Sequence, residues 1–225
     1  MTILQVQPNR GASISDIDAI GNDWQTVEEW RRANNIDTAG QIRLIKLAHM
    51  RYEHPDLEEI TAFLLDFGMH VVKSTEHQRW FGGYGSDQYV YYARQGSRKF
   101  LGGTYEVERY VDLEKAARLK GASPIEDLKD APGGGHLVTA IDPEGFPVCF
   151  IHGQEPAEMG KLPEKIIINY EQEKPRVREF QRFKEGPAAV HKVCRTEFNF
   201  HLPASKVHPI ADSFSFESLV TMGYV

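Results

Sequence analysis

The side chains that could carry chemistry are spread along this chain and do not form one compact motif. His49 lies inside the apolar run Leu44–Tyr52, which has the composition of a strand, and a neutral imidazole there could ligate a metal ion. A strand histidine without partner ligands is also typical of a core or pocket residue, so both interpretations of His49 stay open. His152 follows another apolar run, where it could line the mouth of a pocket or face solvent.

Tyrosines and a cysteine form a second group of candidates. Tyr91 belongs to a tyrosine-rich run after the glycines at 82–85, and this pattern favours an aromatic hairpin whose rings face the core, a pocket or a subunit contact. Cys149 lies in the apolar run 147–152 and is most simply a small buried hydrophobic residue. The glycines at 82–85 and 133–135 lack the strand-to-helix spacing of a phosphate loop, so we expect no nucleotide site.

The composition limits the kinds of partner. A net charge of −6 over 225 residues, with no stripe of Lys and Arg, gives no electrostatic basis for binding nucleic acid. No run approaches the roughly 18 apolar residues of a membrane helix, and the first residues show no export signal. The two cysteines, Cys149 and Cys194, indicate reduced thiols. We therefore expect a cytoplasmic protein that binds a small molecule and does not bind a membrane.

An internal repeat predicts the elements that position these side chains. The run Leu44–Tyr52 is followed by Asp56–Glu58, and 56 residues later the similar run Phe100–Val107 is followed by Asp112–Glu114. Each copy reads as a strand, a turn and a helix opened by an aspartate, because a carboxylate accepts hydrogen bonds from the first N–H groups of a helix. Apolar spacings of three and four after each aspartate support both helices.

Further strands complete two modules. Gly68 is expected to end the first helix, and strands are expected over 69–74, 78–80 and 88–94. The segment 142–145 contains both Pro and Gly, which predicts a β-hairpin between strands at 136–141 and 147–152. Neither module can bury its apolar face alone. The predicted fold class is therefore α+β, with paired βαβββ modules that form one curved mixed sheet.

These residues support a resemblance to a known group of proteins. The segment from His49 to Tyr52, with the helix from Asp56 to Gly68, resembles the opening strand and helix of the vicinal oxygen chelate superfamily. That superfamily includes glyoxalase I, bleomycin-resistance proteins and type I extradiol dioxygenases. The hairpin around 142–151 resembles its closing strands. More narrowly, the chain is similar to fungal type I extradiol-dioxygenase-like proteins over roughly residues 42–152.

The resemblance implies a metal site and its ligand positions. Extradiol enzymes hold Fe(II) through two histidines and a glutamate, which leaves positions open for a catechol and for dioxygen. On this sequence the three positions fall on His49, Tyr105 and Cys149, so His49 is the metal candidate. Tyr105, His152 and Tyr91 are the candidates for a substrate pocket. The resemblance also implies that this first pair is a degenerate copy and that the ligands of complete enzymes lie in a second pair.

The expected organisation has three parts. An N-terminal arm with one helix covers 1–41, the paired domain covers 42–153, and a charged linker with the incomplete start of a second such domain covers 154–225. Relative to the family, the chain is therefore expected to be truncated. From His201 onward the apolar residues show neither helical nor strand periodicity. We expect this region to pack poorly and to contribute no ligand.

Three functions follow as alternatives. The first is an extradiol ring-cleavage dioxygenase-like oxidoreductase, or an inactive relative of one, which acts with Fe(II) on a catechol-type aromatic small molecule. The second is a glyoxalase-like, metal-dependent isomerase or lyase. The third is a non-catalytic binding or dimerisation module. Because open sheet edges are readily covered by another copy, we also expect a homo-oligomer.

Overall fold

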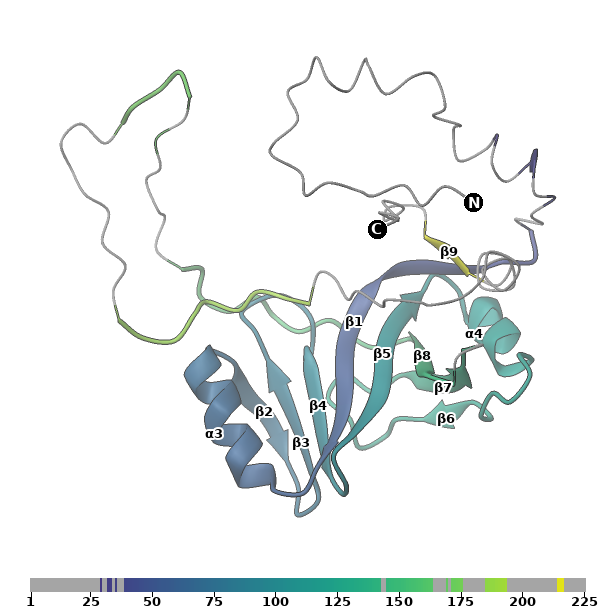
Figure 1. Cartoon of the computed structure of the whole chain (residues 1–225), viewed down its shortest axis with the longest axis horizontal. Helices are drawn as coiled ribbons and strands as arrows, with labels where there is room; N and C mark the ends of the chain where they lie inside the picture. Colours follow the sequence, from purple (N-terminus) through teal and green to yellow (C-terminus); the bar gives the residue numbers. More distant parts are fainter. Residues whose placement is uncertain are drawn as a thin grey trace, which may run out of the picture.

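The centre of the molecule is a curled mixed sheet with one helix outside each half (Figure 1). The computed structural model describes residues 39–142 and 145–163, together with positions 29, 32–33, 35, 169, 171–175, 185–193 and 214–216. Most of the helix predicted for the N-terminal arm lies outside the described residues. Within the described part of the chain, no helix is both long and apolar enough to cross a lipid bilayer.

The sheet runs through eight strands in the order β2-β3-β4-β1-β5-β8-β7-β6. These are β1 (Ile42–His54), β2 (His70–Ser74), β3 (Gln78–Gly82), β4 (Tyr91–Gln95), β5 (Lys99–Val107), β6 (Glu126–Asp127), β7 (His136–Ile141) and β8 (Pro147–His152). The helices are α3 (Leu57–Phe67) and α4 (Tyr110–Ala117). A further strand, β9 (Phe214–Phe216), pairs in parallel with the start of β1.

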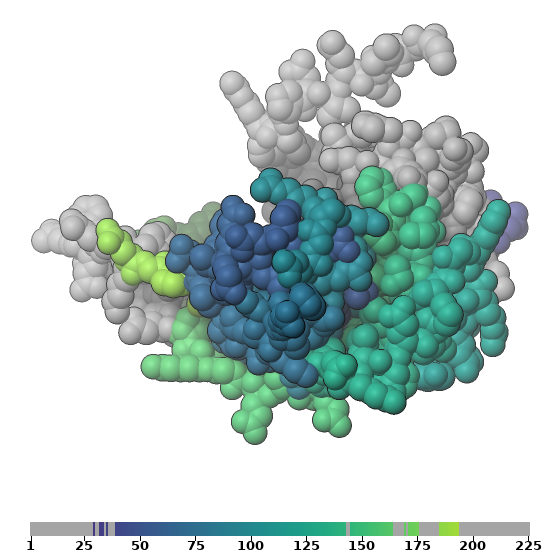
Figure 2. Space-filling view, turned by 90° about the horizontal axis from the view of Figure 1, so that it is seen from below, coloured from purple at the N-terminus to yellow at the C-terminus, as the bar shows by residue number. Residues whose placement is uncertain are grey.

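Two modules of the same order build this sheet. The first is β1-α3-β2-β3-β4 and the second is β5-α4-β6-β7-β8, and they lie side by side, in blue and in teal to green (Figure 2). β1 and β5 pair antiparallel at the centre, while β1 pairs in parallel with β4 and β5 with β8. The predicted α+β fold of paired βαβββ modules is confirmed. The two-residue strand β6 was not predicted, because so short a strand carries no periodicity.

Local signals at both ends of helix α3 act as predicted. The carboxylate of Asp56 accepts hydrogen bonds from the backbone N–H groups of Glu58 (2.8 Å) and Glu59 (3.1 Å). Gly68 ends the helix with φ of 107°, a left-handed conformation that favours glycine. Its N–H donates to Leu64 O (3.2 Å) and Leu65 O (3.0 Å), so two of the last carbonyl groups are satisfied.

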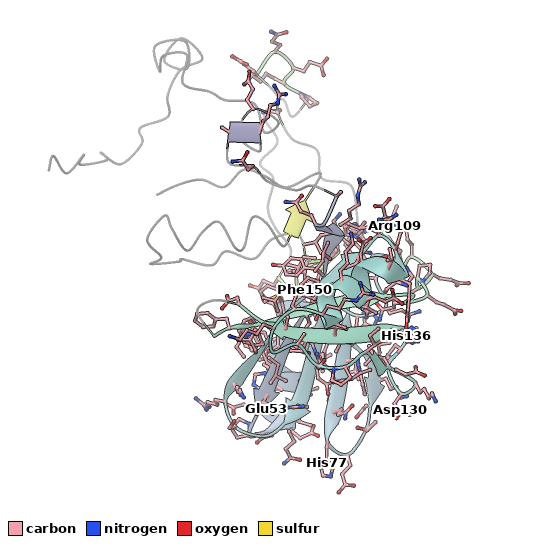
Figure 3. The ribbon with its side chains drawn as sticks, turned by 90° about the vertical axis from the view of Figure 1, so that its right-hand side faces the viewer. Glu53, His77, Arg109, Asp130, His136 and Phe150 are labelled. Atoms are coloured by element: carbon pink, nitrogen blue, oxygen red, sulfur yellow. The ribbon has the colours of Figure 1, made fainter. Side chains whose placement is uncertain are left out.

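Helix α4 begins differently from the prediction. It starts at Tyr110 after Arg109, which makes no capping hydrogen bond through its side chain, so the prediction that Asp112 opens the helix is wrong. Asp112 lies in the first turn and is fully buried, where its carboxylate pairs with Arg109 (3.2 Å) and Lys115 (3.0 Å). Arg109 lies beside α4 near the top of the curled sheet as drawn, while Glu53 and His77 lie near its bottom (Figure 3).

The two faces of the curled sheet bury different side chains. The outer face packs on the helices, with Leu113 of α4 in one cluster with Phe150 and Leu64 of α3 in another with Phe81. Neighbouring strand residues point to the inner face, because side chains alternate along a strand. The inner clusters contain Trp80, Tyr89, Tyr92, Leu101 and Ala131, and Ala48, Leu128, Leu137, Cys149 and Ile151. We call this inner face the cup.

Two segments beyond β8 pack on the turn between β3 and β4. The backbone N–H of Tyr84 donates to Val190 O (2.8 Å), and that of Gly85 donates to His191 O (3.1 Å). The ring of Tyr84 stacks on that of His191 at 4.7 Å, and Tyr84 O accepts from the N–H of Gly160 (2.9 Å). The predicted domain boundary after residue 153 is therefore crossed by hydrogen bonds to the first module.

The far C-terminal region also contributes to the sheet. The strand 214–216 pairs with residues 42–44 of β1. The prediction that the whole region from His201 onward packs poorly is therefore wrong at 214–216, where pairing along the free side of β1 supplies backbone hydrogen bonds that periodicity does not reveal. The remainder of that region lies outside the described residues.

Candidate functional site

The cup is filled by large side chains, and one exposed hydrogen bond spans its two ends. The rings of Trp80 and Tyr92 lie 5.5 Å apart, and Tyr89 is almost fully buried beside them. Lys73, on the edge strand β2, places its ammonium group 5.8 Å from the centre of the Trp80 ring and donates to Asp130 O at 2.6 Å. This hydrogen bond joins the strand at one end of the sheet to the turn that follows β6 at the other end.

His49 is fully buried inside the cup. Its ring lies 4.4 Å from that of Tyr89, and it is paired in register with Thr104 on β5. Burial first, and the charge of Arg51 second, hold the pKa of its imidazole well below the ordinary value. Within the described part of the chain, His49 Nδ1 and Thr104 Oγ1 have no hydrogen-bond partner. The imidazole is therefore neutral at pH 7, as a metal ligand must be.

Arg51 occupies the centre of the cup beside Cys149. Its Nη1 lies 3.4 Å from Cys149 Sγ, and its guanidinium carbon lies 5.2 Å from the centre of the Tyr92 ring. Cys149 Sγ also lies 3.5 Å from Thr139 Oγ1 and 3.4 Å from Leu101 O. The thiol and the aromatic face stabilise the partly buried cation, so this position is already occupied by a positive charge.

A second charged group lies further along the cup. Lys46 pairs with Asp87 and with Glu106, the latter at 3.3 Å. The neighbouring Asp87 and Glu106 carboxylates raise the pKa of Lys46, although burial, the largest single influence, acts in the opposite direction. One ammonium group is therefore shared between two carboxylates.

The side chains of the cup do not fit Fe(II). Among the described residues, no three of His, Cys, Asp or Glu lie close enough to hold a metal ion. The neighbours of His49 are Thr104, its register partner, and the ring of Tyr89, while the Cys149 thiol on the next strand accepts a hydrogen bond from the Arg51 guanidinium. A divalent ion bound beside that guanidinium would be repelled by its positive charge. A two-histidine, one-carboxylate site needs two neutral imidazoles and an anionic carboxylate, not a cation, around the metal ion.

Tyr105, a pocket candidate and the expected second ligand position, faces away from the cup. It packs against the cluster under helix α4 that contains Leu113 and Phe150. Burial there raises the pKa of its hydroxyl to about 12. A register shift explains the difference, because β1 advances two residues, from Leu47 to His49, while β5 advances one. Thr104 therefore faces His49, and Tyr105 points to the helices.

Tyr91 also lies on the outer face, near helix α3. Its hydroxyl is 2.8 Å from His54 Nε2, and its ring stacks on that of Tyr52 at 5.1 Å. Burial, and then the neighbouring Tyr52, raise the pKa of Tyr91 above its ordinary value. This tyrosine packs against Tyr52 and the cluster under α3 and does not reach the cup.

His152 lies in a third place, at the end of β8. Its ring meets that of Tyr110, the first residue of α4, edge-on at 5.9 Å, and its register partner His136 meets the same ring at 5.5 Å. The structure therefore does not bring the four predicted site residues together. His49 lies in the cup, while the three pocket candidates lie at separate positions on the outer face.

Sequence reasoning missed two residues that define the cup, Arg51 and Thr104. Residues two apart in a strand share a face, so the position of Arg51 beside His49 on the inner face of β1 could have been predicted from the sequence. No comparable signal existed for Thr104, because its orientation depends on the irregular pairing of β1 with β5.

Comparisons with known proteins agree with this fold. No protein-family model matches the chain, and no curated protein matches it. Among solved structures, a variant of homoprotocatechuate 2,3-dioxygenase from Brevibacterium fuscum is similar, with 19% identity over 55% of this chain and 36% of that one, and a TM-score of 0.50. A Mn(II)-bound glyoxalase from Novosphingobium aromaticivorans is similar, with 18% identity over 54% and 43% and a TM-score of 0.48. Homoprotocatechuate 2,3-dioxygenase from Arthrobacter globiformis has 21% identity over 53% and 39%, with a TM-score of 0.48.

The chain thus spans less than half the length of these solved structures. The 19% identity and TM-score of 0.50 with the Brevibacterium fuscum dioxygenase show a shared fold and nothing finer. The fold expected from the resemblance to the vicinal oxygen chelate superfamily is confirmed by that likeness. The narrower resemblance to fungal type I enzymes stays a prediction.

Proposed function

We propose that residues 42–152 form a non-catalytic module of an extradiol-dioxygenase-like protein. In this proposal the paired modules act as a filled scaffold, and Fe(II)-dependent chemistry on a catechol-type aromatic substrate belongs to residues outside the pair. The observation that carries the proposal is the contact between the Arg51 guanidinium and Cys149 Sγ at 3.4 Å. It puts a cation at the centre of the cup, where a metal site would need a carboxylate.

Metal binding and oxygen uptake test this proposal. The purified chain would be loaded anaerobically with Fe(II), or separately with Mn(II), and its metal content measured after desalting. Oxygen uptake would then be followed with a series of catechols. We expect the chain to retain less than one metal ion after desalting. Oxygen uptake should not exceed that of free Fe(II) with the same catechols.

A matched variant separates the cup from other metal sites. His49→Phe removes the buried histidine of the cup and keeps a ring of similar size beside Tyr89. Stoichiometric metal in the wild type that is lost in His49→Phe, together with catechol turnover, would overturn the proposal and restore a catalytic cup. Isomerase or lyase activity that depends on His49 would support the glyoxalase-like alternative instead.

A second role, homodimerisation, is favoured by one observation on the sheet edge. All five residues of β2 are exposed, and Val71 and Val72 are among the exposed large apolar residues, as is Phe67 at the end of α3. An edge strand with free backbone groups and apolar side chains can pair with the same strand of a second copy. The mass of the protein in solution, measured by light scattering after size exclusion, should therefore be that of a dimer.

The matching variant is Val71→Lys, because lysine on an edge strand opposes pairing with a second strand. It should shift the dimer toward monomer, whereas Ile141→Lys, at an exposed position on β7, should not. A wild-type chain that stays monomeric at all concentrations tested would count against this role.

A further inference from the structure

The hairpin loop between β6 and β7 holds its shape through its own hydrogen bonds. It covers residues 128–135, and the N–H of Leu128 donates to Gly135 O (2.9 Å), which closes the loop at its base. Inside the loop, the N–H of Ala131 donates to Leu128 O (3.0 Å) and that of Gly134 donates to Ala131 O (3.1 Å). Compact loops whose ends lie close together frequently carry function. We call residues 128–135 the lid.

The lid covers part of the inner face of the cup. Ala131 packs against the aromatic cluster that contains Trp80 and Tyr89, and Leu128 packs against the cluster that contains Cys149. Trp80 is 3% exposed, Tyr89 2% and Cys149 0%. Leu128 and Ala131 are themselves half-buried. The lid therefore lies between these inner side chains and the solvent.

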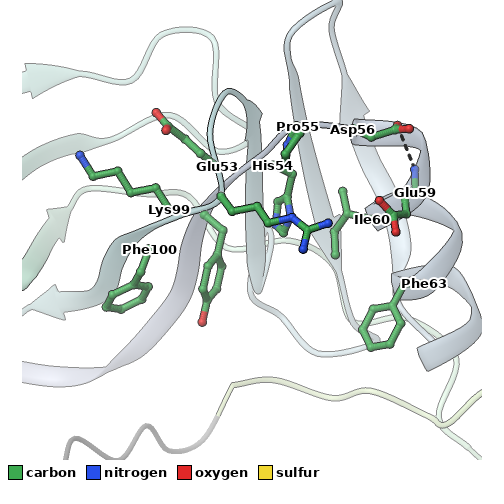
Figure 4. Close-up of a pocket in the computed structure, with 11 residues that line it drawn as sticks. Glu53, His54, Pro55, Asp56, Glu59, Ile60, Phe63, Lys99 and Phe100 are labelled. Carbon is green, nitrogen blue, oxygen red and sulfur yellow. Dashed lines mark hydrogen bonds between the residues drawn. The ribbon is translucent and has the colours of Figure 1, made fainter.

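A groove on the outer face of the sheet, with a volume of about 520 Å³, is separate from the cup (Figure 4). It lies between α3 and the adjoining ends of β1 and β5, and its lining includes Tyr52, Ile60 and Phe63. Tyr52 stacks at 5.1 Å on Tyr91, which packs against the cluster under α3. The groove thus opens on the opposite side of the sheet and does not lead to the residues beneath the lid.

Lys73, on β2, holds the lid from one side. Its ammonium group donates to Asp130 O at 2.6 Å and lies 5.8 Å from the centre of the Trp80 ring. The hydrogen bond is exposed to solvent, and the net contribution of such a bond is modest because water can replace the partner. Lys73 can therefore release the lid without any change in the pairing of the strands.

Two further hydrogen bonds hold the lid against the segment after β8. Gln154 Nε2 donates to Pro132 O (3.2 Å), and the N–H of Glu155 donates to Gly133 O (2.9 Å). The side chain of Gln154 is also hydrogen-bonded to Tyr89 in the cup. These two bonds and the one from the lysine of β2 can break while the internal bonds of the lid stay intact.

Both ends of the lid can act as hinges. Gly133, Gly134 and Gly135 have φ of 73°, 60° and 100°, in the left-handed region that glycine adopts without steric cost. At its other end the lid joins β6, which consists of two exposed residues. A glycine turn and a two-residue strand give up few buried contacts when they rotate, so they open more easily than the central strands.

We propose that residues 128–135 are a lid that opens as a unit and controls the access of solvent and small molecules to the cup, with Lys73 as its latch. The closed position is the one in this structure. In the open position Trp80, Tyr89 and Cys149 become accessible. The proposal does not depend on the non-catalytic role, because the contacts of the lid are the same whether or not the cup binds a metal ion.

Two probes on the full chain measure the opening of the lid. The first is hydrogen exchange of the Glu155 amide, whose acceptor is Gly133 O. The second is the rate at which N-ethylmaleimide modifies Cys149, measured with Cys194→Ser so that one thiol remains. The amide of Phe150, which is fully buried in the sheet, is the reference for global unfolding. We expect both probes to give a smaller free energy of opening, and a weaker dependence on urea, than exchange of this reference amide.

Lys73→Met tests the latch. It removes the donor to Asp130 O and keeps an apolar side chain of similar length beside Trp80. We expect both probes to react about threefold to tenfold faster, because one hydrogen bond and one cation–π contact are lost. Lys129→Met is the matched control, because Lys129 lies in the lid but its ammonium group pairs with Asp127 (3.5 Å). It should leave both rates unchanged.

Gly133→Ala tests the contact between the lid and the rest of the protein. An added Cβ would lie 2.7 Å from Glu155 O and 2.5 Å from Gln88 Cγ, so it would push the closed lid away. We expect both probes to react faster by about tenfold or more. Gly134→Ala is the matched control, because its φ is also positive, at 60°, but its Cβ would meet no atom within 4 Å. Its effect should be much smaller.

Three outcomes contradict this proposal. The first is that Glu155 exchanges and Cys149 reacts only through global unfolding, with the urea dependence of the Phe150 amide. The second is an equal effect of Lys73→Met and Lys129→Met on both probes. The third is local exchange at Glu155 while Cys149 reacts only on global unfolding, because the lid would then not cover the cup.

Discussion

Replacing His49 by phenylalanine should make the stability of this protein less dependent on pH below about 6.5. His49 is 1% exposed, and burial followed by the charge of Arg51 holds its pKa well below the ordinary value. The ring therefore stays neutral in the folded chain but takes up a proton in the unfolded chain. The unfolded state binds more protons as the pH falls, so acid lowers the free energy of unfolding.

The size of the effect follows from this difference in protonation. At about pH 7.5 the imidazole is neutral in both the folded and the unfolded state, so its protonation contributes almost nothing to the free energy of unfolding. At about pH 5.0 an unfolded histidine with a pKa near 6.5 is almost fully charged, which lowers the free energy of unfolding by about 2 kcal/mol while the folded ring stays neutral. Phenylalanine fills a similar volume beside Tyr89, 4.4 Å away, and carries no proton.

Urea unfolding followed by circular dichroism at the two pH values measures this difference. Carboxylates and the other histidines titrate in both proteins, so their effect cancels when the wild type and His49→Phe are compared. His77→Gln, a change at an exposed histidine, is the control. Its free energy of unfolding should fall between the two pH values by as much as that of the wild type. Equal losses in the wild type and His49→Phe would show that His49 is hydrated or charged in the folded protein, and would refute the reasoning.

Three further predictions test the fold. Asp56→Ala should lower the free energy of unfolding by about 1 kcal/mol in urea, because two N–H groups of α3 lose their acceptor; no change would mean that the cap is not formed in solution. Gly68→Ala should cost about 1–2 kcal/mol, because its φ is 107°. An added Cβ there would also lie 1.8 Å from Ala188 O, so limited proteolysis should cleave 185–193 faster, and an unchanged digestion pattern would argue against that contact. Absorbance at alkaline pH should show Tyr89 and Tyr105 ionising near pH 12, and replacement of either by phenylalanine should remove part of that late phase; an unaltered curve would mean that both rings are hydrated.

Short-range rules in the sequence predicted most of the elements. The hairpin β7–β8 has the predicted bounds, because Asp142 closes its turn by accepting from Gly145 N (3.0 Å) through its backbone and from Phe146 N (2.8 Å) through its carboxylate. Helix α3 has both predicted ends, because Asp56 and Gly68 act within one turn of their own position. Such signals depend on neighbours in sequence and can be read without the fold.

The same rule failed for Asp112 because a distant partner decided its position. Its carboxylate is buried in the first turn of α4, where Lys115 also donates to the carbonyls of Ala39 and Gln41. The aspartate is therefore used to hold a lysine between the helix and the start of β1. The sequence pattern for a capping aspartate and for a buried, paired one is the same.

By itself, the sequence determined the two repeated modules, and hence the α+β class, since apolar periodicity and caps are local properties. The central pairing of β1 with β5 was seen only in the structure. The content of the cup was decided only in three dimensions. The extra residue of β1 between Leu47 and His49 brings His49 onto the face of Thr104, whereas Tyr105, the next residue of β5, points outward, because a shift of one residue exchanges the faces of a strand. Arg51 meets Cys149 across 98 residues of chain, and that contact places a cation in the cup where the sequence had suggested a metal.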